Sequence, residues 1–104
     1  MKIAITSTGN DLKATVDPRF GRCAYFVIYD TESKAVEFIP NPNINATEGA
    51  GPASVELVAS RNISKVVSGE FGAKIKPLFD SLKVQMIAMK ESKTIEEVIE
   101  MFNK

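Results

Sequence analysis

Short apolar stretches with the lengths of β-strands recur along the chain. They are rich in β-branched and aromatic residues, which favour strands. The predicted strands cover residues 2–6, 25–30, 35–39, 64–68 and 84–89. Polar turn residues follow the first strand, and a four-residue turn separates the second from the third. We expect Pro40 to end the third strand, because proline has no N–H to donate to a sheet.

Apolar residues at helical spacing predict three helices, which alternate with the last two strands and cover residues 50–61, 71–82 and 94–102. The second helix contains Pro77, which we expect in or just past its first turn, where a missing N–H does least harm. The third begins with Thr94 and Glu97, whose spacing is that of a capping box.

The element order βββαβαβα predicts an α/β fold with a mixed five-stranded sheet and helices on both faces. The first three strands are expected to be antiparallel, and the last two parallel to one another. We place the fourth strand beside the first and parallel to it. Residues 1–104 are expected to form a single domain.

This topology brings three loops to one edge of the sheet. The segments after the first strand (9–22), after the third (41–51) and after the fourth (68–72) all lie there. Open α/β sheets usually bind ligands at such an edge. The N-termini of two helices are expected there as well, and they favour anions.

Composition limits what the edge can bind. With 44% hydrophobic and 25% charged residues, the chain is typical of a globular protein. Its 13 basic and 13 acidic residues cancel, so no overall field attracts nucleic acid or a membrane. No apolar run approaches the roughly 20 residues of a membrane span, and no signal peptide is recognisable. The single cysteine fits a reducing compartment, so we expect a cytoplasmic protein.

The sequence DPRFGRCAYF, residues 17–26, is the most unusual part of the chain. It places Arg19 and Arg22 next to Cys23, the only cysteine. Two guanidinium groups would stabilise a thiolate and lower the pKa of the thiol. Cys23 could equally be a small buried core residue. Strand alternation does not decide between the two, and its place at the start of the second strand slightly favours an exposed thiol.

Loop glycines allow a backbone to approach a ligand closely. Together with the arginines and the thiol, they suit a bulky anion that also accepts one sulfur ligand, such as a metal–sulfur or oxoanion cluster. The predicted cluster-binding residues are Arg19, Gly21, Arg22, Cys23, Gly49, Gly51, Ser68, Gly69 and Gly72, with Cys23 as the metal ligand.

Catalysis has little support in the sequence, because the chain has no histidine and no recognisable nucleophile–base pair. One cysteine cannot form a closed zinc site within the chain, and the P-loop motif is absent. Two alternatives stay open. One is a metal-dependent hydrolase that uses Asp17, Glu48 and Glu70, and the other is an interaction module that docks to a partner such as a metal-cluster assembly ATPase.

The segments DPRFGRCAYFVIYD, GAG, VVSGEFGAKIKPLF and TIEEVIEMF resemble the dinitrogenase iron–molybdenum cofactor-binding family over nearly the whole chain. NifX, NafY and the C-terminal part of NifB belong to that family. The resemblance implies a ribonuclease H-like fold and non-catalytic binding or carriage of a metal–sulfur cluster, either like the iron–molybdenum cofactor or a Mo, Cu or Fe sulfide. Relatives that bind the nitrogenase cofactor often have histidine where this chain has Arg19. Another relative carries a molybdenum–copper sulfide cluster without ordinary ligation, a mode that suits this loop better.

Overall fold

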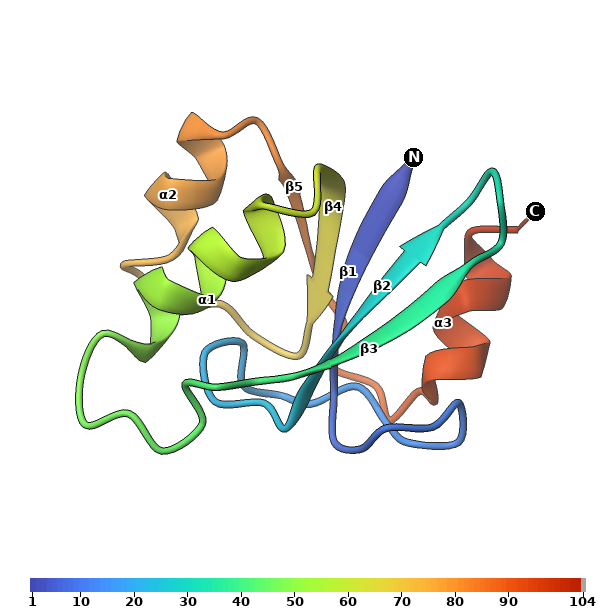
Figure 1. The fold of residues 1–104 in the computed structure, drawn as a ribbon, viewed down its shortest axis with the longest axis horizontal. Coiled ribbons are helices and arrows are strands. Elements are labelled where there is room, and N and C mark those ends of the chain that lie inside the picture. The colour runs from blue at the N-terminus through green and yellow to red at the C-terminus, as the bar shows by residue number, and fades with distance from the viewer. Residues whose placement is uncertain (104) are drawn as a thin grey trace.

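The computed structural model describes residues 1–103. Its eight elements follow the predicted order (Figure 1). In chain order they are β1 (Lys2–Ser7), β2 (Tyr25–Asp30), β3 (Val36–Pro40), α1 (Ala50–Ala59), β4 (Ile63–Ser68), α2 (Lys76–Ser81), β5 (Gln85–Ala88) and α3 (Ile95–Met101). No helix in this part of the chain is long and apolar enough to cross a bilayer.

The five strands form one sheet in the order β3-β2-β1-β4-β5. β2 is antiparallel to both β1 and β3, whereas β4 is parallel to both β1 and β5. In the middle of the sheet, Ile5 of β1 lies between Val27 of β2 and Val67 of β4. The predicted topology, with the fourth strand beside the first, is therefore confirmed.

The helices cover both faces of the sheet, as predicted (Figure 1). α1 and α2 pack on one face, over a core that includes Phe26, Val58 and Phe79. α3 packs on the other face, where Ile95, Val98 and Ile99 join the second core. Because the sheet is covered on both sides, apolar residues fill the middle of its central strands, such as Ile3–Ile5 of β1 and Val66–Val67 of β4.

The predicted second helix begins later than the apolar spacing indicated. α2 starts at Lys76, with Pro77 in its first turn as expected. Phe71 lies in the preceding loop, where its ring packs against Phe20 and Phe79 at centroid distances of 6.0 and 6.3 Å. The residue is apolar because it joins this aromatic cluster, so the prediction of a helix from residue 71 was wrong.

β3 ends at Pro40, one residue later than predicted, and Pro40 pairs with Tyr25. The next residue, Asn41, donates its backbone N–H to the Ala24 carbonyl at 3.0 Å. Backbone N–H directions alternate along a strand, so the Pro40 nitrogen faces away from β2 towards the open edge. A residue without an N–H is tolerated there.

The capping box at the start of α3 is confirmed. The Glu97 N–H donates to Thr94 Oγ1 at 3.1 Å, and the Thr94 N–H donates to Glu97 Oε1 at 2.9 Å. The hydrogen bond from the Thr94 backbone is the main reason that the pKa of Glu97 is lowered.

Candidate functional site

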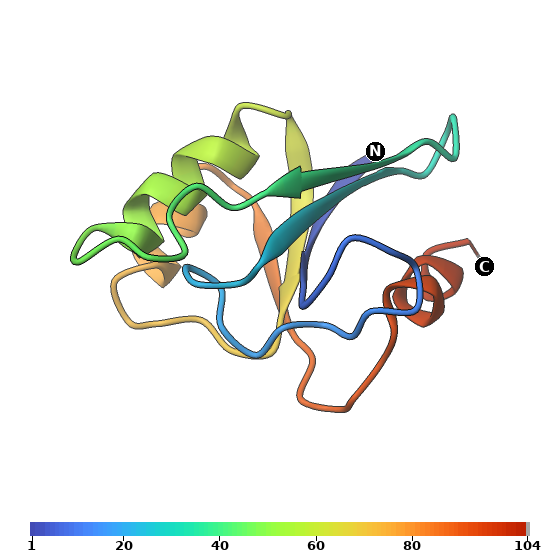
Figure 2. The same ribbon diagram turned by 60° about the horizontal axis from the view of Figure 1, so that its bottom comes forward.

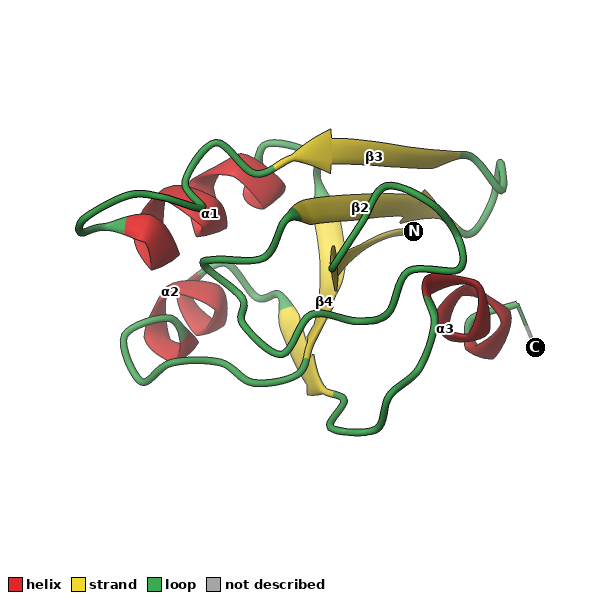
Figure 3. Ribbon diagram, turned by 90° about the horizontal axis from the view of Figure 1, so that it is seen from below, coloured by secondary structure: helices red, strands yellow, loops and turns green. Residues whose placement is uncertain are grey.

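A groove of about 440 Å³ lies at the sheet edge where the three loops meet. Its lining comes from residues 19–22, from Gly49 to Pro52 at the start of α1, and from the 70–75 loop. Figure 2 brings these loops forward, and Figure 3 shows from below how they lie at the ends of α1 and α2 and of the strands. The convergence of segments far apart in sequence is therefore confirmed.

Phe20 anchors the first loop in the core. Its side chain is buried, and its ring lies 5.3 Å from that of Phe79 and 5.5 Å from that of Phe26. The two arginines sit on either side of this anchor in sequence. The core contact of Phe20 therefore fixes the part of the loop that carries the two arginines at the groove.

Arg19 is exposed but has a buried partner. Its Nε donates to Asp17 Oδ1 at 3.3 Å, and its backbone N–H donates to the same oxygen at 2.9 Å. The Asp17 side chain is only 2% exposed, whereas 60% of the Arg19 side-chain surface is open to solvent. Arg19 thus lines the groove, and the buried Asp17 carboxylate partly offsets its positive charge.

Arg22 has no acidic partner among residues 1–103. Its Nη1 donates to the Ile44 carbonyl at 3.2 Å, which ties it to the second loop. Lys74 also lines the groove, and Glu70 adds one carboxylate. Lys74 was missed as a site residue because the sequence directed attention only to the glycines of its loop.

The N-terminus of α1 opens onto the groove. Gly49 precedes the helix with a φ of 75°, a conformation that favours glycine, and no side chain caps the first turn. No acidic residue lies in that turn. Gly21 packs against it so closely that a Cβ there would lie 3.0 Å from the Gly51 nitrogen. The loop and the helix end can approach in this way because both residues lack a side chain.

Three of the predicted site residues, Ser68, Gly69 and Cys23, lie outside the groove lining. Ser68 is buried, and its hydroxyl donates to the Glu70 carbonyl at 3.1 Å. Gly69 lies against the backbone of Pro18, where an added Cβ would come within 2.3 Å of Pro18 Cα. In the structure, both residues shape the loop next to the groove.

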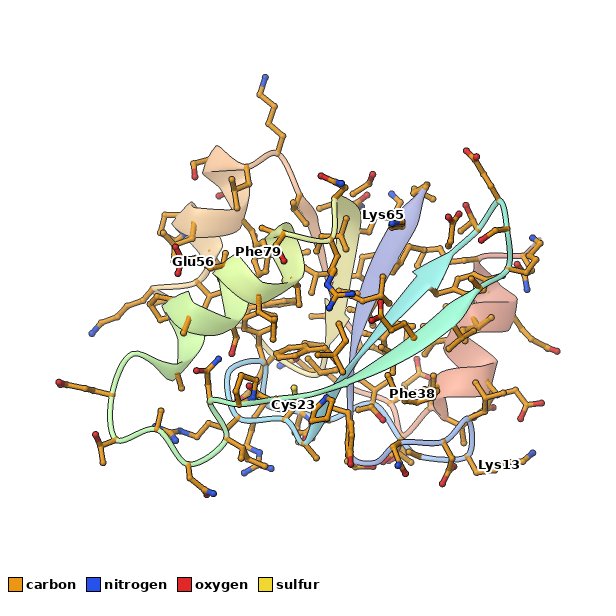
Figure 4. The ribbon with its side chains drawn as sticks, viewed as in Figure 1. Lys13, Cys23, Phe38, Glu56, Lys65 and Phe79 are labelled. Atoms are coloured by element: carbon orange, nitrogen blue, oxygen red, sulfur yellow. The ribbon has the colours of Figure 1, made fainter. Side chains whose placement is uncertain are left out.

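Cys23 is buried in the core beneath α1, and its side chain has no exposed surface (Figure 4). Burial, and to a lesser extent the negative charge of Asp17, raise the pKa of the thiol to about 12, and Arg19 lowers it only weakly. The expectation of an exposed thiol with a lowered pKa was wrong. Cys23 precedes β2, so it does not follow the strand's alternation and shares a core with Phe26 instead of Val27.

The native thiol is expected to resist alkylation, because at pH 8 a pKa of about 12 leaves about one thiolate in ten thousand. The unfolded thiol, with a pKa near 9.0, ionises first. The free energy of unfolding should therefore fall as the pH rises from about 9 to about 12, and below pH 9 the contribution is fully present. Urea unfolding of the parent and of Cys23→Ala at pH 8 and 10 isolates this effect. An equal pH dependence in both proteins, or rapid alkylation of the folded parent, would contradict it.

The three acids considered for a hydrolase do not form a metal site. Asp17 is buried behind Arg19, Glu48 is exposed in the second loop and Glu70 lies at the groove. Across residues 1–103, no three His, Cys, Asp or Glu side chains are grouped closely enough to hold a metal ion. The geometry therefore gives no support to metal-dependent hydrolysis.

Comparisons with known proteins show which family the chain resembles over its length. A model of the family described as dinitrogenase iron–molybdenum cofactor matches residues 1–104. An uncharacterised protein of Methanocaldococcus jannaschii is 30% identical over 105 residues, which cover 98% of this chain and 85% of the relative.

Solved structures share both fold and sequence with this chain. The apo form of the orange protein from Desulfovibrio gigas matches with a TM-score of 0.89 and 28% identity, over 97% of this chain and 85% of that one. A Thermotoga protein with a proposed NifB assignment matches with a TM-score of 0.83 and 34% identity, over the same shares of the two chains. With a family model that spans every residue, this chain belongs to the dinitrogenase iron–molybdenum cofactor family.

Proposed function

We propose that this protein binds and carries a preformed, anionic metal–sulfur cluster in the groove between residues 19–22, the start of α1 and the 70–75 loop. The observation that carries the proposal is the gathering of Arg19, Arg22 and Lys74 around the uncapped N-terminus of α1. Family membership supports cluster binding in general. The cluster is cargo in this proposal, and the protein contributes binding and not catalysis.

The groove fits such a cargo in size and chemistry. Its volume of about 440 Å³ falls within the range of small-ligand sites. Guanidinium, ammonium and backbone N–H groups are donors, and sulfide or oxo groups on the surface of an anionic cluster would accept from them. Cys23 is buried and not part of the lining, and the chain has no histidine. The cluster would therefore be held through its outer atoms, without a thiolate or imidazole bond to a metal.

The two arginines are not equivalent as tests of this site. Replacing Arg19 by alanine would leave the buried Asp17 carboxylate without its charged partner, at a cost to stability. Arg22 bonds only a backbone carbonyl in an exposed position, so its loss should affect binding more than folding. Arg22 and Lys74 are therefore the residues of choice for substitution.

Arg22→Ala and Lys74→Ala are each expected to weaken binding of tetrathiomolybdate about tenfold, because each removes a charged donor. Arg61→Ala is the matched control, since Arg61 lies beyond the far end of α1 and pairs with Glu37 at 2.6 Å. Titration by calorimetry or visible absorption measures the affinities. If all three variants bind as tightly as the parent, the groove is not the anion site. Where the variants do bind more weakly, anaerobic isolation of the protein from a metal-replete native host, with elemental analysis, identifies the metals of the cargo.

A further inference from the structure

Asp17 is a buried carboxylate that the proposed function does not use. Its backbone ties it to the centre of the sheet, since its N–H donates to the Thr6 carbonyl at 3.0 Å. Its own carbonyl accepts from Thr6 Oγ1 at 2.8 Å and from the Gly69 N–H at 3.1 Å. The backbone of Asp17 is therefore fixed relative to β1 and to the loop that follows β4.

The carboxylate meets Arg19 along one side of the guanidinium. Nε lies 3.3 Å from Oδ1, Nη2 lies 3.5 Å from Oδ2, and the Arg19 backbone N–H closes a turn onto Oδ1 at 2.9 Å. Pro18 between the two residues restricts the turn further. A guanidinium has five N–H donors in a fixed plane. With two directed at Asp17, three remain for the groove, in an orientation set by the buried partner.

Arg22 and Lys74 have no comparable fixation. Arg22 makes one bond to the Ile44 carbonyl, and no salt bridge involves Lys74 among the residues that the structure describes. Their positive charges are not offset by a paired carboxylate, whereas that of Arg19 is. The groove thus combines one oriented donor group, whose charge Asp17 partly offsets, with two charged side chains that are less restricted.

We propose that Asp17 is a positioning residue, which aims the Arg19 guanidinium into the groove and offsets its charge. Arg19 then contributes direction to the recognition of an anion, and Arg22 and Lys74 contribute net charge. This division of roles rests on the proposed function for the ligand, but the fixation of Arg19 by Asp17 is a property of the free protein.

The fixation is tested without any ligand. In ¹H–¹⁵N spectra of the parent protein, the Nε–H of Arg19 should exchange with water at least about tenfold more slowly than that of Arg22. Asp17→Asn should reduce the difference, because its amide oxygen is a weaker, uncharged acceptor for Nε–H and its amide nitrogen cannot accept from Nη2. The control Asp11→Asn, which changes an aspartate that accepts backbone N–H bonds from Lys13 and Ala14 outside the groove, should preserve it. Equal exchange of the two arginines in the parent overturns the proposal, even if Asp17→Asn does not fold.

Anion titration tests the division of roles. At high salt, Asp17→Asn should bind tetrathiomolybdate roughly three- to tenfold more weakly than the parent, because Arg19 is no longer oriented. Its affinity should also depend more steeply on salt, because the Arg19 charge is no longer offset. Parent-like affinity and salt dependence in Asp17→Asn would refute the division of roles. If the parent itself fails to bind, the proposed function fails, and the exchange rates alone decide the role of Asp17.

Discussion

Phe20→Ala should lower the free energy of unfolding by about 3–5 kcal/mol, the usual cost of truncating a buried phenylalanine. Phe20 is 3% exposed and contacts three other rings, so the remaining side chains cannot close the space without breaking the aromatic cluster. Because the residue lies between Arg19 and Arg22, the same change should also loosen the first wall of the groove. Urea unfolding measures the first effect, and tetrathiomolybdate titration of the folded variant measures the second.

Phe38→Ala is the control for this experiment, because Phe38 packs on the opposite face of the sheet, under α3 (Figure 4). It should also lose stability, but its affinity for the anion should match that of the parent. Phe20→Leu, which keeps most of the buried apolar surface, should lie between the parent and Phe20→Ala in stability. Undiminished binding by folded Phe20→Ala would show that the core contact does not hold the arginines in place.

Gly69→Ala is expected to destabilise the protein by about 1–3 kcal/mol or more, the range for overpacking a closed site. The new methyl would lie 2.3 Å from Pro18 Cα and 3.1 Å from its carbonyl carbon. These are backbone atoms, so the segment from Asp17 to Arg19 has to move. The Gly69 N–H bond to the Asp17 carbonyl should lengthen as a result. Denaturant unfolding measures the stability loss, and the Arg19 Nε–H exchange rate reports the displacement.

Gly72→Ala provides a matched control within the same loop. An added Cβ at Gly72 meets only Ile75 Cγ1, at 4.0 Å, which is ordinary van der Waals contact. Neither glycine has a positive φ, so the two substitutions differ in available space and not in backbone strain. Similar stability losses in both variants would contradict the close packing of the 68–72 loop on Pro18.

The topology was predictable because it depends on patterns that repeat along the chain. Strand lengths, helical spacing and the capping box at Thr94 placed the elements in order, connection rules predicted which strands run parallel, and the assumed place of the fourth strand beside the first proved correct. The meeting of the three loops followed from this topology. The ribonuclease H-like classification implied by the family resemblance stays a prediction.

The individual roles at the site were less predictable, because they depend on contacts between residues from different elements. Nothing in the spacing shows that Cys23 turns into the core before β2 begins. The proximity of Asp17 to Arg19 in sequence does not reveal that the carboxylate is buried. Phe71 fits a helical pattern although it serves the aromatic cluster from a loop. In each case tertiary packing, and not the local pattern of residues, decided where the side chain lies.

Pro40 also affects how readily copies of this protein would aggregate through their sheet edges. β3 lies at one edge of the sheet, and exposed edges can recruit strands from other chains into aggregates. Because the Pro40 nitrogen carries no hydrogen, an incoming strand finds no donor at the end of β3 nearest the second loop. At the other edge, β5 has only four residues, and Lys83 and Lys90 lie just beyond its ends. Both edges therefore discourage intermolecular β-pairing without any additional element to cover them.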